Sequence, residues 1–295
     1  MTRLAAVEVG GSHVCAAWMD TGRWAADGEP YRAPLNASGP AAEIIQTIAG
    51  CADRLGDLTN RSLSVAMPGP FDYVTGVGRF RDVGKFDALD GVAVGARVHD
   101  SLNGKPSGIV FVNDAAAFGL GEWIAGAAAG HRRAVALTLG TGIGSAFIAD
   151  GTAVSEGAQV PPCGFVHLLR PGGAPLEDRV STRAIVQAYG GRAEGVIDVI
   201  RAARDGDDRA IHVLDDAFGF LGSVLAPWVR AFAAEVIVVG GKIADAWDEV
   251  EPRLSRGLAS RGARIAIRPA AHADTAALVG AAYNTVAQAG ADSGC

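Results

Sequence analysis

Apolar and polar positions along the chain predict a strand-rich beginning. Segments 3–9 and 13–19 are apolar and rich in β-prone residues. Gly10 and Gly11 join them, and because glycine turns there at no steric cost, this arrangement predicts a hairpin. Apolar residues then recur at helical spacing over 41–55, which predicts an amphipathic helix.

Two later apolar runs predict strands that end in distinctive segments. The run at 62–67 ends in Pro68-Gly69-Pro70, a rigid loop that cannot continue a strand. The run at 108–112 delivers Asn113-Asp114 at its end, and a helix is predicted over 115–125. Asp114 can therefore serve as the N-cap of that helix.

The second half of the chain repeats the plan of the first. A strand over 134–139, the segment Gly140-Thr141-Gly142-Ile143-Gly144 and an apolar run to Ala149 predict a second hairpin. The remaining pattern predicts, in order, helices at 185–189, 196–203 and 210–229, a strand at 234–239 before Gly240-Gly241, a polar-faced strand within 261–268, and a closing helix at 275–288. Strands that alternate with helices predict an α/β architecture.

Both glycine turns can hold phosphate, because uncovered backbone N–H groups cradle phosphate oxygens. They comprise Gly10, Gly11 and Ser12 in the first half, and Gly140, Thr141 and Gly142 in the second. A single such turn is more simply an ordinary tight hairpin, but a matching pair favours binding of a nucleotide triphosphate. The second turn is not a dinucleotide fingerprint, since that motif opens a helix and a β-prone run follows here.

Composition narrows the class of protein. The 295 residues suffice for two lobes, and a net charge of −6 argues against a nucleic-acid partner. The apolar stretch 134–149 is broken by glycines and too short to cross a membrane, and no secretory leader is evident, so we expect a cytoplasmic protein. The cysteines, Cys15, Cys51, Cys163 and Cys295, lack the spacing of a zinc site or a disulfide framework.

As a set, these motifs resemble the ROK family of sugar kinases, from Val7-Glu8-Val9-Gly10-Gly11-Ser12 to residues 277–282. The resemblance implies a two-lobed actin/hexokinase-like (ribonuclease H-like, duplicated) fold with a cleft between the lobes. It implies a small lobe over 1–115, on which a closing helix at about 275–290 packs back, and a larger lobe over 116–274. A homodimer that acts on a small molecule is also implied.

The resemblance further assigns roles to individual residues. Asp114 would take the proton from the attacking hydroxyl, Asn113 would hold a neighbouring hydroxyl, and Gly69 and Pro70 would wall the sugar pocket. The glycine turns would bind the phosphates of ATP, Gly240 and Gly241 would let the adenosine approach, and Glu8 would organise Mg²⁺. Each residue also has a plainer reading: Asp114 as a helix cap, Gly69-Pro70 as a surface turn and Gly240-Gly241 as a strand-to-helix turn.

Several positions depart from the family pattern. Glu8 replaces the usual Asp, and His13 stands where a lysine is common. Gly164 replaces a sugar-binding glutamate, whereas His167 and Glu177 match retained sugar contacts. The cysteine-rich zinc loop is missing, and Cys163 and His167 alone are too few ligands, so no zinc site is expected.

These features predict an ATP-dependent kinase that phosphorylates the primary hydroxyl of a sugar or sugar-like polyol. Losing one carboxylate and gaining Phe165 makes the pocket less polar, which favours a non-glucose hexose, a modified sugar or a C7-cyclitol. The alternative is a catalytically silent sugar-binding or sensor protein of the same fold. A transcription regulator is disfavoured, since the first glycine turn begins within ten residues of Met1 and the chain is acidic.

Overall fold

The computed structural model describes residues 3–190 and 193–292, and the chain divides into two compact units. Unit 1 comprises Met1–Ala125 and Asp274–Cys295, and unit 2 comprises Gly126–Ala273. The predicted boundary at residue 115 therefore falls inside α3 (Asp114–Ala125), which belongs to unit 1. The last helix also joins unit 1, which makes the two units nearly equal in length. Cys295 lies outside the described residues.

Unit 1 is built on a mixed sheet in the order β3-β2-β1-β5-β8, with β4 paired to β2. The hairpin β1–β2 is antiparallel, and β1, β5 and β8 are parallel to one another, so the predicted hairpin and strands are confirmed. The strands are β1 (Arg3–Val9), β2 (His13–Asp20), β3 (Ala25–Ala26), β4 (Tyr31–Pro34), β5 (Ser62–Met67) and β8 (Gly108–Asn113), with a separate small ribbon of β6 (Phe71–Asp72) and β7 (Val77–Gly78).

Helices cover both faces of this sheet, because successive side chains of a strand point to opposite faces. Ala5, Val7 and Val9 face the core that contains α1 (Ala41–Asp53) and α2 (Val94–Ser101). Ala6 faces the other way, toward Leu278 of α10 (Ala276–Asp292). Glu8 is two residues from Ala6 on the same strand, so its side chain also lies on the face that α10 covers.

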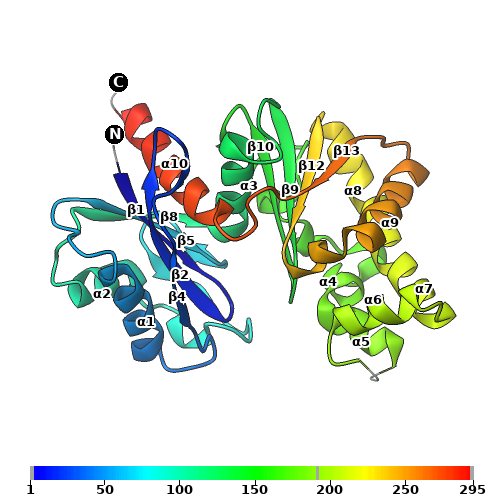
Figure 1. The fold of residues 1–295 in the computed structure, drawn as a ribbon, viewed down its shortest axis with the longest axis horizontal. Helices are drawn as coiled ribbons and strands as arrows, with labels where there is room; N and C mark the ends of the chain where they lie inside the picture. Colours follow the sequence, from blue (N-terminus) through cyan, green and yellow to red (C-terminus); the bar gives the residue numbers. More distant parts are fainter. Residues whose placement is uncertain (1–2, 191–192, 293–295) are drawn as a thin grey trace. The chain divides into compact units, whose positions relative to one another are not determined.

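The C-terminal helix α10 lies against β1 and α3, although it comes from the far end of the chain (Figure 1). Glycine makes this approach possible. A Cβ atom at Gly121 would collide with the backbone of Ala276, and one at Gly280 would collide with the carbonyl of Ala117. A buried hydrogen bond of 2.7 Å between the hydroxyls of Ser64 and Thr285 also fixes the helix on β5.

Unit 2 repeats this plan with a sheet in the order β11-β10-β9-β12-β13. Its antiparallel hairpin β9–β10 is again followed by a parallel strand, β12. The strands are β9 (Arg133–Leu139), β10 (Ile143–Ala149), β11 (Thr152–Ala153), β12 (Val236–Gly240) and β13 (Ala266–Pro269). The hairpin, the strand before Gly240 and the strand within 261–268 are therefore confirmed, and the observed fold is α/β.

The helices of unit 2 pack around a core that includes Phe147, Leu225 and Ile237. They are α4 (Glu177–Val180), α5 (Thr182–Tyr189), α6 (Val196–Arg204), α7 (Asp208–Leu214), α8 (Phe220–Ala231) and α9 (Trp247–Ser260), labelled in Figure 1. The predicted continuous helix 210–229 is interrupted by a π-helical turn over Asp215–Gly219. Short 3-10 turns lie at Asp87–Leu89, Pro162–Gly164, Val166–Leu168, Pro171–Gly173 and Lys242–Ala246.

The helical stretch Asp208–Ala231 is long and apolar enough to cross a membrane by length and composition. Core helices of globular proteins meet the same criterion. Leu221, Leu225 and Val229 on this stretch are buried in the core of unit 2, which accounts for its apolar character.

Candidate active site

Asn113 and Asp114 lie where β8 ends and α3 begins, the end of a parallel strand at which α/β proteins bind ligands. The Asn113 side chain is fully engaged. Its Oδ1 accepts from the N–H of Ala116 at 3.0 Å, and its Nδ2 donates to Asp114 Oδ1 at 3.1 Å. The prediction that Asp114 caps the helix is thus corrected, because the bond to the residue three positions on belongs to Asn113. Asp114 instead accepts from the adjacent Ala115 N–H at 2.8 Å.

Asp114 is a half-buried carboxylate. Burial raises the pKa of its carboxyl above the ordinary value, and hydrogen bonds from Ala115 and Asn113 only partly offset this effect. A carboxylate whose pKa is raised by burial is a stronger base than one in water, and the neighbouring amide holds it in place. The arrangement can therefore accept a proton from an alcohol.

Tyr73, which the sequence reasoning missed, links this strand end to the proline-framed loop. Its hydroxyl accepts from Asn113 Nδ2 at 2.9 Å and donates to the carbonyl of Met67 at 3.2 Å. A Cβ atom at Gly69 would lie 3.2 Å from the Tyr73 hydroxyl and 3.8 Å from Asn113 Nδ2. The structure thus brings Gly69, and with it Pro70, next to Asn113.

Glu8 lies at the end of β1 and is half-buried. Burial and, after it, the charge of Asp114 raise the pKa of its carboxyl to about 7, and Arg32 opposes the shift. The two carboxylates therefore act on each other electrostatically, and a divalent cation near them would relieve that repulsion. Carboxylate oxygens are ligands that Mg²⁺ prefers, so this pair fits such an ion.

The first glycine turn, between β1 and β2, is closed by a hydrogen bond of 2.8 Å from the Gly10 N–H to the carbonyl of His13. Gly11 and Ser12 are exposed at its tip. The ammonium of Lys85 lies 3.2 Å from the position that a Cβ atom on residue 11 would occupy. A cation above an exposed glycine turn favours an anion there. Lys85 could not be assigned to this turn from the sequence, because it lies far from the turn along the chain.

The second glycine turn, between β9 and β10, is held by the helices that follow it in the chain. Glu177 Oε1 accepts from the Ile143 N–H at 2.8 Å, and a Cβ atom at Gly142 would lie 2.5 Å from that oxygen. Thr182 Oγ1 donates to the carbonyl of Gly140 at 2.6 Å. Thr141 is exposed at the tip. Glu177, predicted from resemblance as a sugar contact, thus also shapes the turn, and Thr182 was missed.

His167 and Phe165 lie on a segment that Ser145 anchors. The Ser145 hydroxyl donates to the Gly164 carbonyl at 2.8 Å and accepts from the Val166 N–H at 2.9 Å. The rings of Phe165 and His167 stack with centroids 5.3 Å apart and an interplanar angle of 23°. Burial lowers the pKa of His167, although the charge of Glu177 opposes this, so the ring is biased toward its neutral form.

Gly240 and Gly241 form the end of β12. Gly241 has a φ of +87°, and a Cβ atom there would collide with the backbone of Leu139, so only glycine fits. The chain after β12 therefore packs directly against the backbone of β9 at this point.

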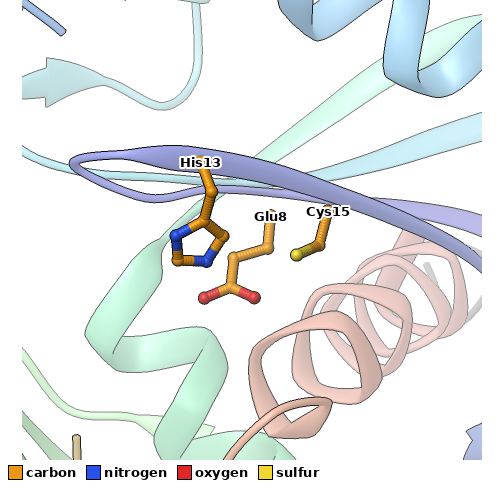
Figure 2. A group of neighbouring side chains, drawn as sticks. All are labelled: Glu8, His13 and Cys15. Atoms are coloured by element: carbon orange, nitrogen blue, oxygen red, sulfur yellow. The ribbon is translucent and has the colours of Figure 1, made fainter. Parts of the chain in front are cut away.

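A further cluster joins Glu8 to His13 and Cys15, all on one face of the β1–β2 hairpin (Figure 2). Their ligand atoms lie within 4.8 Å of one another. Burial raises the pKa of the Cys15 thiol to about 11, and the neighbouring Glu8 contributes to the shift. The expectation of no zinc site rested on cysteine spacing, on the missing zinc loop and on Cys163 and His167 being too few ligands. None of these considers residues that a hairpin brings together.

Comparison with known proteins places the chain in a family. A profile of the ROK family matches residues 4–287. The chain is 27% identical over 278 residues to a glucokinase of Halalkalibacterium halodurans, covering 82% of this chain and 81% of that protein. Among solved structures, the inorganic polyphosphate/ATP-glucomannokinase of Arthrobacter sp. strain KM shares 25% identity with a TM-score of 0.70, over 98% of this chain and all of that one (100%).

The ROK hexokinase of Thermus thermophilus is also similar in structure, with a TM-score of 0.74 and 23% identity, covering 97% of this chain and 100% of that one. This likeness confirms the actin/hexokinase-like fold predicted from the motifs. The family profile spans nearly the whole described chain. The protein therefore belongs to the ROK family.

Proposed function

We propose that this protein is an ATP-dependent kinase that transfers the γ-phosphoryl group to the primary hydroxyl of a sugar or sugar-like polyol. The observation that carries the proposal is Asp114, a desolvated carboxylate at a strand end that Asn113 holds at 3.1 Å, in a chain of the ROK family. Phosphoryl transfer depends mainly on positioning and charge neutralisation, so one well-placed base suffices.

In this proposal Asp114 accepts the proton of the attacking hydroxyl as the new O–P bond forms. Asn113 orients Asp114, and the wall formed by Gly69 and Pro70 confines the acceptor beside it. Glu8 would hold Mg²⁺ directly or through its waters. When bound, Mg²⁺ neutralises charge on the phosphates.

The glycine positions serve the nucleotide. We assign backbone N–H groups of Gly10, Gly11 and Ser12, and of Gly140, Thr141 and Gly142, to the phosphates of ATP. Lys85 adds a positive charge at the first turn, where the family commonly has a lysine at position 13. By the family resemblance we assign Gly240 and Gly241, at the end of β12, to the adenosine.

For the acceptor, we propose a compound other than glucose: a non-glucose hexose, a modified sugar or a C7-cyclitol. Gly164 offers no carboxylate, and the neighbouring Phe165 presents an aromatic face stacked on His167. Glu177 engages Oε1 with Ile143, so we assign its Oε2 to the acceptor. Sites that bind hydroxyls by hydrogen bonds discriminate strongly, because an unpaired buried group is costly.

The family resemblance also supports a cytoplasmic homodimer. The proposed phosphoryl transfer depends on neither the location nor the oligomeric state of the protein. Light scattering after size exclusion measures the oligomeric state directly.

The test is ADP release from Mg-ATP over a panel of hexoses, modified sugars and cyclitols, with the product position read by phosphorus NMR. Asp114→Asn should lower kcat by about 10²- to 10⁴-fold, since that is what general-base assistance contributes, while acceptor binding is largely kept. Near wild-type turnover in this variant rejects Asp114 as the base. Efficient phosphorylation of glucose rejects the proposed acceptor class, and no turnover with any acceptor favours a silent sugar-binding protein.

A further inference from the structure

Glu8, His13 and Cys15 are brought together by the register of one hairpin. Glu8 of β1 is directly opposite Cys15 of β2, and His13 precedes Cys15 by two residues on the same strand. Residues opposite each other or two apart share a face of a sheet, so all three side chains leave the hairpin on one side. Figure 2 shows the imidazole and the thiol flanking the Glu8 carboxylate.

The donor atoms of this cluster are of three kinds. They are a carboxylate oxygen, an imidazole nitrogen and a cysteine sulfur, all within 4.8 Å of one another. Around a tetrahedral zinc ion, ligand atoms lie about 3.3–3.8 Å apart, given bond lengths of about 2.0–2.3 Å. Small side-chain rotations close that gap. Nitrogen and thiolate select Zn²⁺ and similar ions over Mg²⁺, which prefers oxygen alone.

The surroundings are those of a half-open site. Cys15 is fully buried against an apolar wall that includes Met19, Leu278 and Ala282. Glu8 and His13 are only half-buried, next to the exposed tip of the first glycine turn. Asp114 and Asp274 act electrostatically on Glu8 as negative charges, while Arg32 acts as a positive one. An ion would enter from the turn and meet the thiol last.

We propose that Glu8, His13 and Cys15 form a binding site for a thiophilic divalent cation of the Zn²⁺ class. The three side chains leave a fourth coordination position for water. Neither the missing zinc loop of the family nor the Mg²⁺ of the proposed reaction accounts for this cluster. If the proposed function holds, occupation of the site withdraws Glu8 from Mg²⁺, so zinc inhibits the kinase.

The binding test needs no enzymatic activity, so its result is independent of the proposed function. Co²⁺ is titrated into the metal-free protein, and thiolate-to-cobalt absorption is recorded; Zn²⁺ is then added in competition. We expect one equivalent to produce the band, and Zn²⁺ to abolish it. Because Cys163 is exposed, a Cys163→Ser protein serves as the parent for all variants.

In that parent, Cys15→Ala should abolish the absorption band, and His13→Gln should weaken Zn²⁺ binding. We expect the Zn²⁺ affinity to fall by about tenfold or more, because removing even the hydrogen-bond partner of a zinc ligand costs about 10- to 100-fold in affinity. Cys51→Ser, at a buried cysteine outside the cluster, should bind as the parent does. Melting curves check that Cys15→Ala is folded. His13→Gln provides a second test of the site, because His13 is only half-buried and its replacement disturbs the core less. Unchanged affinity in folded Cys15→Ala, or in His13→Gln, overturns the proposal.

Discussion

The carboxylate of Glu177 accepts a hydrogen bond of 2.8 Å from the backbone N–H of Ile143, the first residue of β10. The start of α4 is thereby tied to the glycine turn between β9 and β10. Thr182, at the start of α5, binds the other side of the same turn through Gly140. The conformation of this turn therefore depends on side chains that follow their partners by 34 and 42 residues.

We expect Glu177→Ala to raise the KM for ATP by roughly tenfold, because it leaves the Ile143 N–H without its partner and loosens the turn. Thr182→Val removes the other side-chain bond to the turn without removing a charge, and it should raise the KM for ATP in the same direction. Steady-state kinetics with ATP and the acceptor varied in turn measure both effects. An increase confined to the KM of the acceptor, in Glu177→Ala alone, would show that Glu177 serves only the acceptor.

The pH dependence of kcat/KM should reveal the environment of Asp114. A base must be deprotonated to act, and burial raises the pKa of Asp114. Activity should therefore fall as the pH decreases through a value above the ordinary aspartate pKa of about 3.9. Glu8, whose pKa burial raises to about 7, adds a second titration in the same direction.

Comparison with Glu8→Gln separates the two groups. That variant should lose the titration of Glu8 and keep that of Asp114. A wild-type profile that stays flat down to the ordinary aspartate pKa of about 3.9 contradicts the assignment of a desolvated base.

Lys85→Met should raise the KM for ATP by roughly 10- to 100-fold, because a charge-assisted contact to phosphate contributes about 1.5–3 kcal/mol. Lys85→Arg keeps the charge and should retain most of the affinity. Lys105→Met is the matched control, since Lys105 pairs with Asp53 at 2.9 Å on the surface, away from the turn. An unchanged KM for ATP in Lys85→Met excludes a role for this ammonium.

The close contact of α3 and α10 predicts opposite effects for two glycines of the same helix. Gly280→Ala places a methyl group against the carbonyl of Ala117 and should destabilise the protein by about 1–3 kcal/mol or more. Gly290→Ala meets nothing within 4 Å and should be neutral or stabilising by up to about 1 kcal/mol. Melting temperatures under identical conditions compare them, and equal melting temperatures would argue against the packing.

The repeated hairpins and their parallel partners could be predicted because short β-prone apolar runs and glycine turns are local signals. The helix α9 was not predicted: Pro252 lies inside it, and proline is disfavoured in a helix interior. The π-helical turn at Asp215–Gly219 was also missed, since the apolar pattern of 210–229 runs through it without a break.

The residues predicted for the site were found by motif, whereas their partners were not. Tyr73 and Lys85 reach Asn113 and Gly11 from distant segments, and only the fold brings them there. The pairing of Glu8 with Cys15 could have been read from the hairpin, because a two-stranded register follows from the turn. The cap at Asn113 instead of Asp114 depends on where the helix begins, which sequence patterns place only to within a residue or two.

Because α10 covers the sheet that β1 begins, unit 1 is completed during protein synthesis only after unit 2 has been made. Leu278, Val279 and Ala282 belong to the same apolar cluster as Ala6 and Cys15, so that cluster is unfinished until residue 282 has left the ribosome. The second unit is continuous in the chain and can fold while the first still waits for its last helix. Nascent chains that stall before this helix emerge would expose the apolar face of β1 and β2, and chaperones would recognise them there.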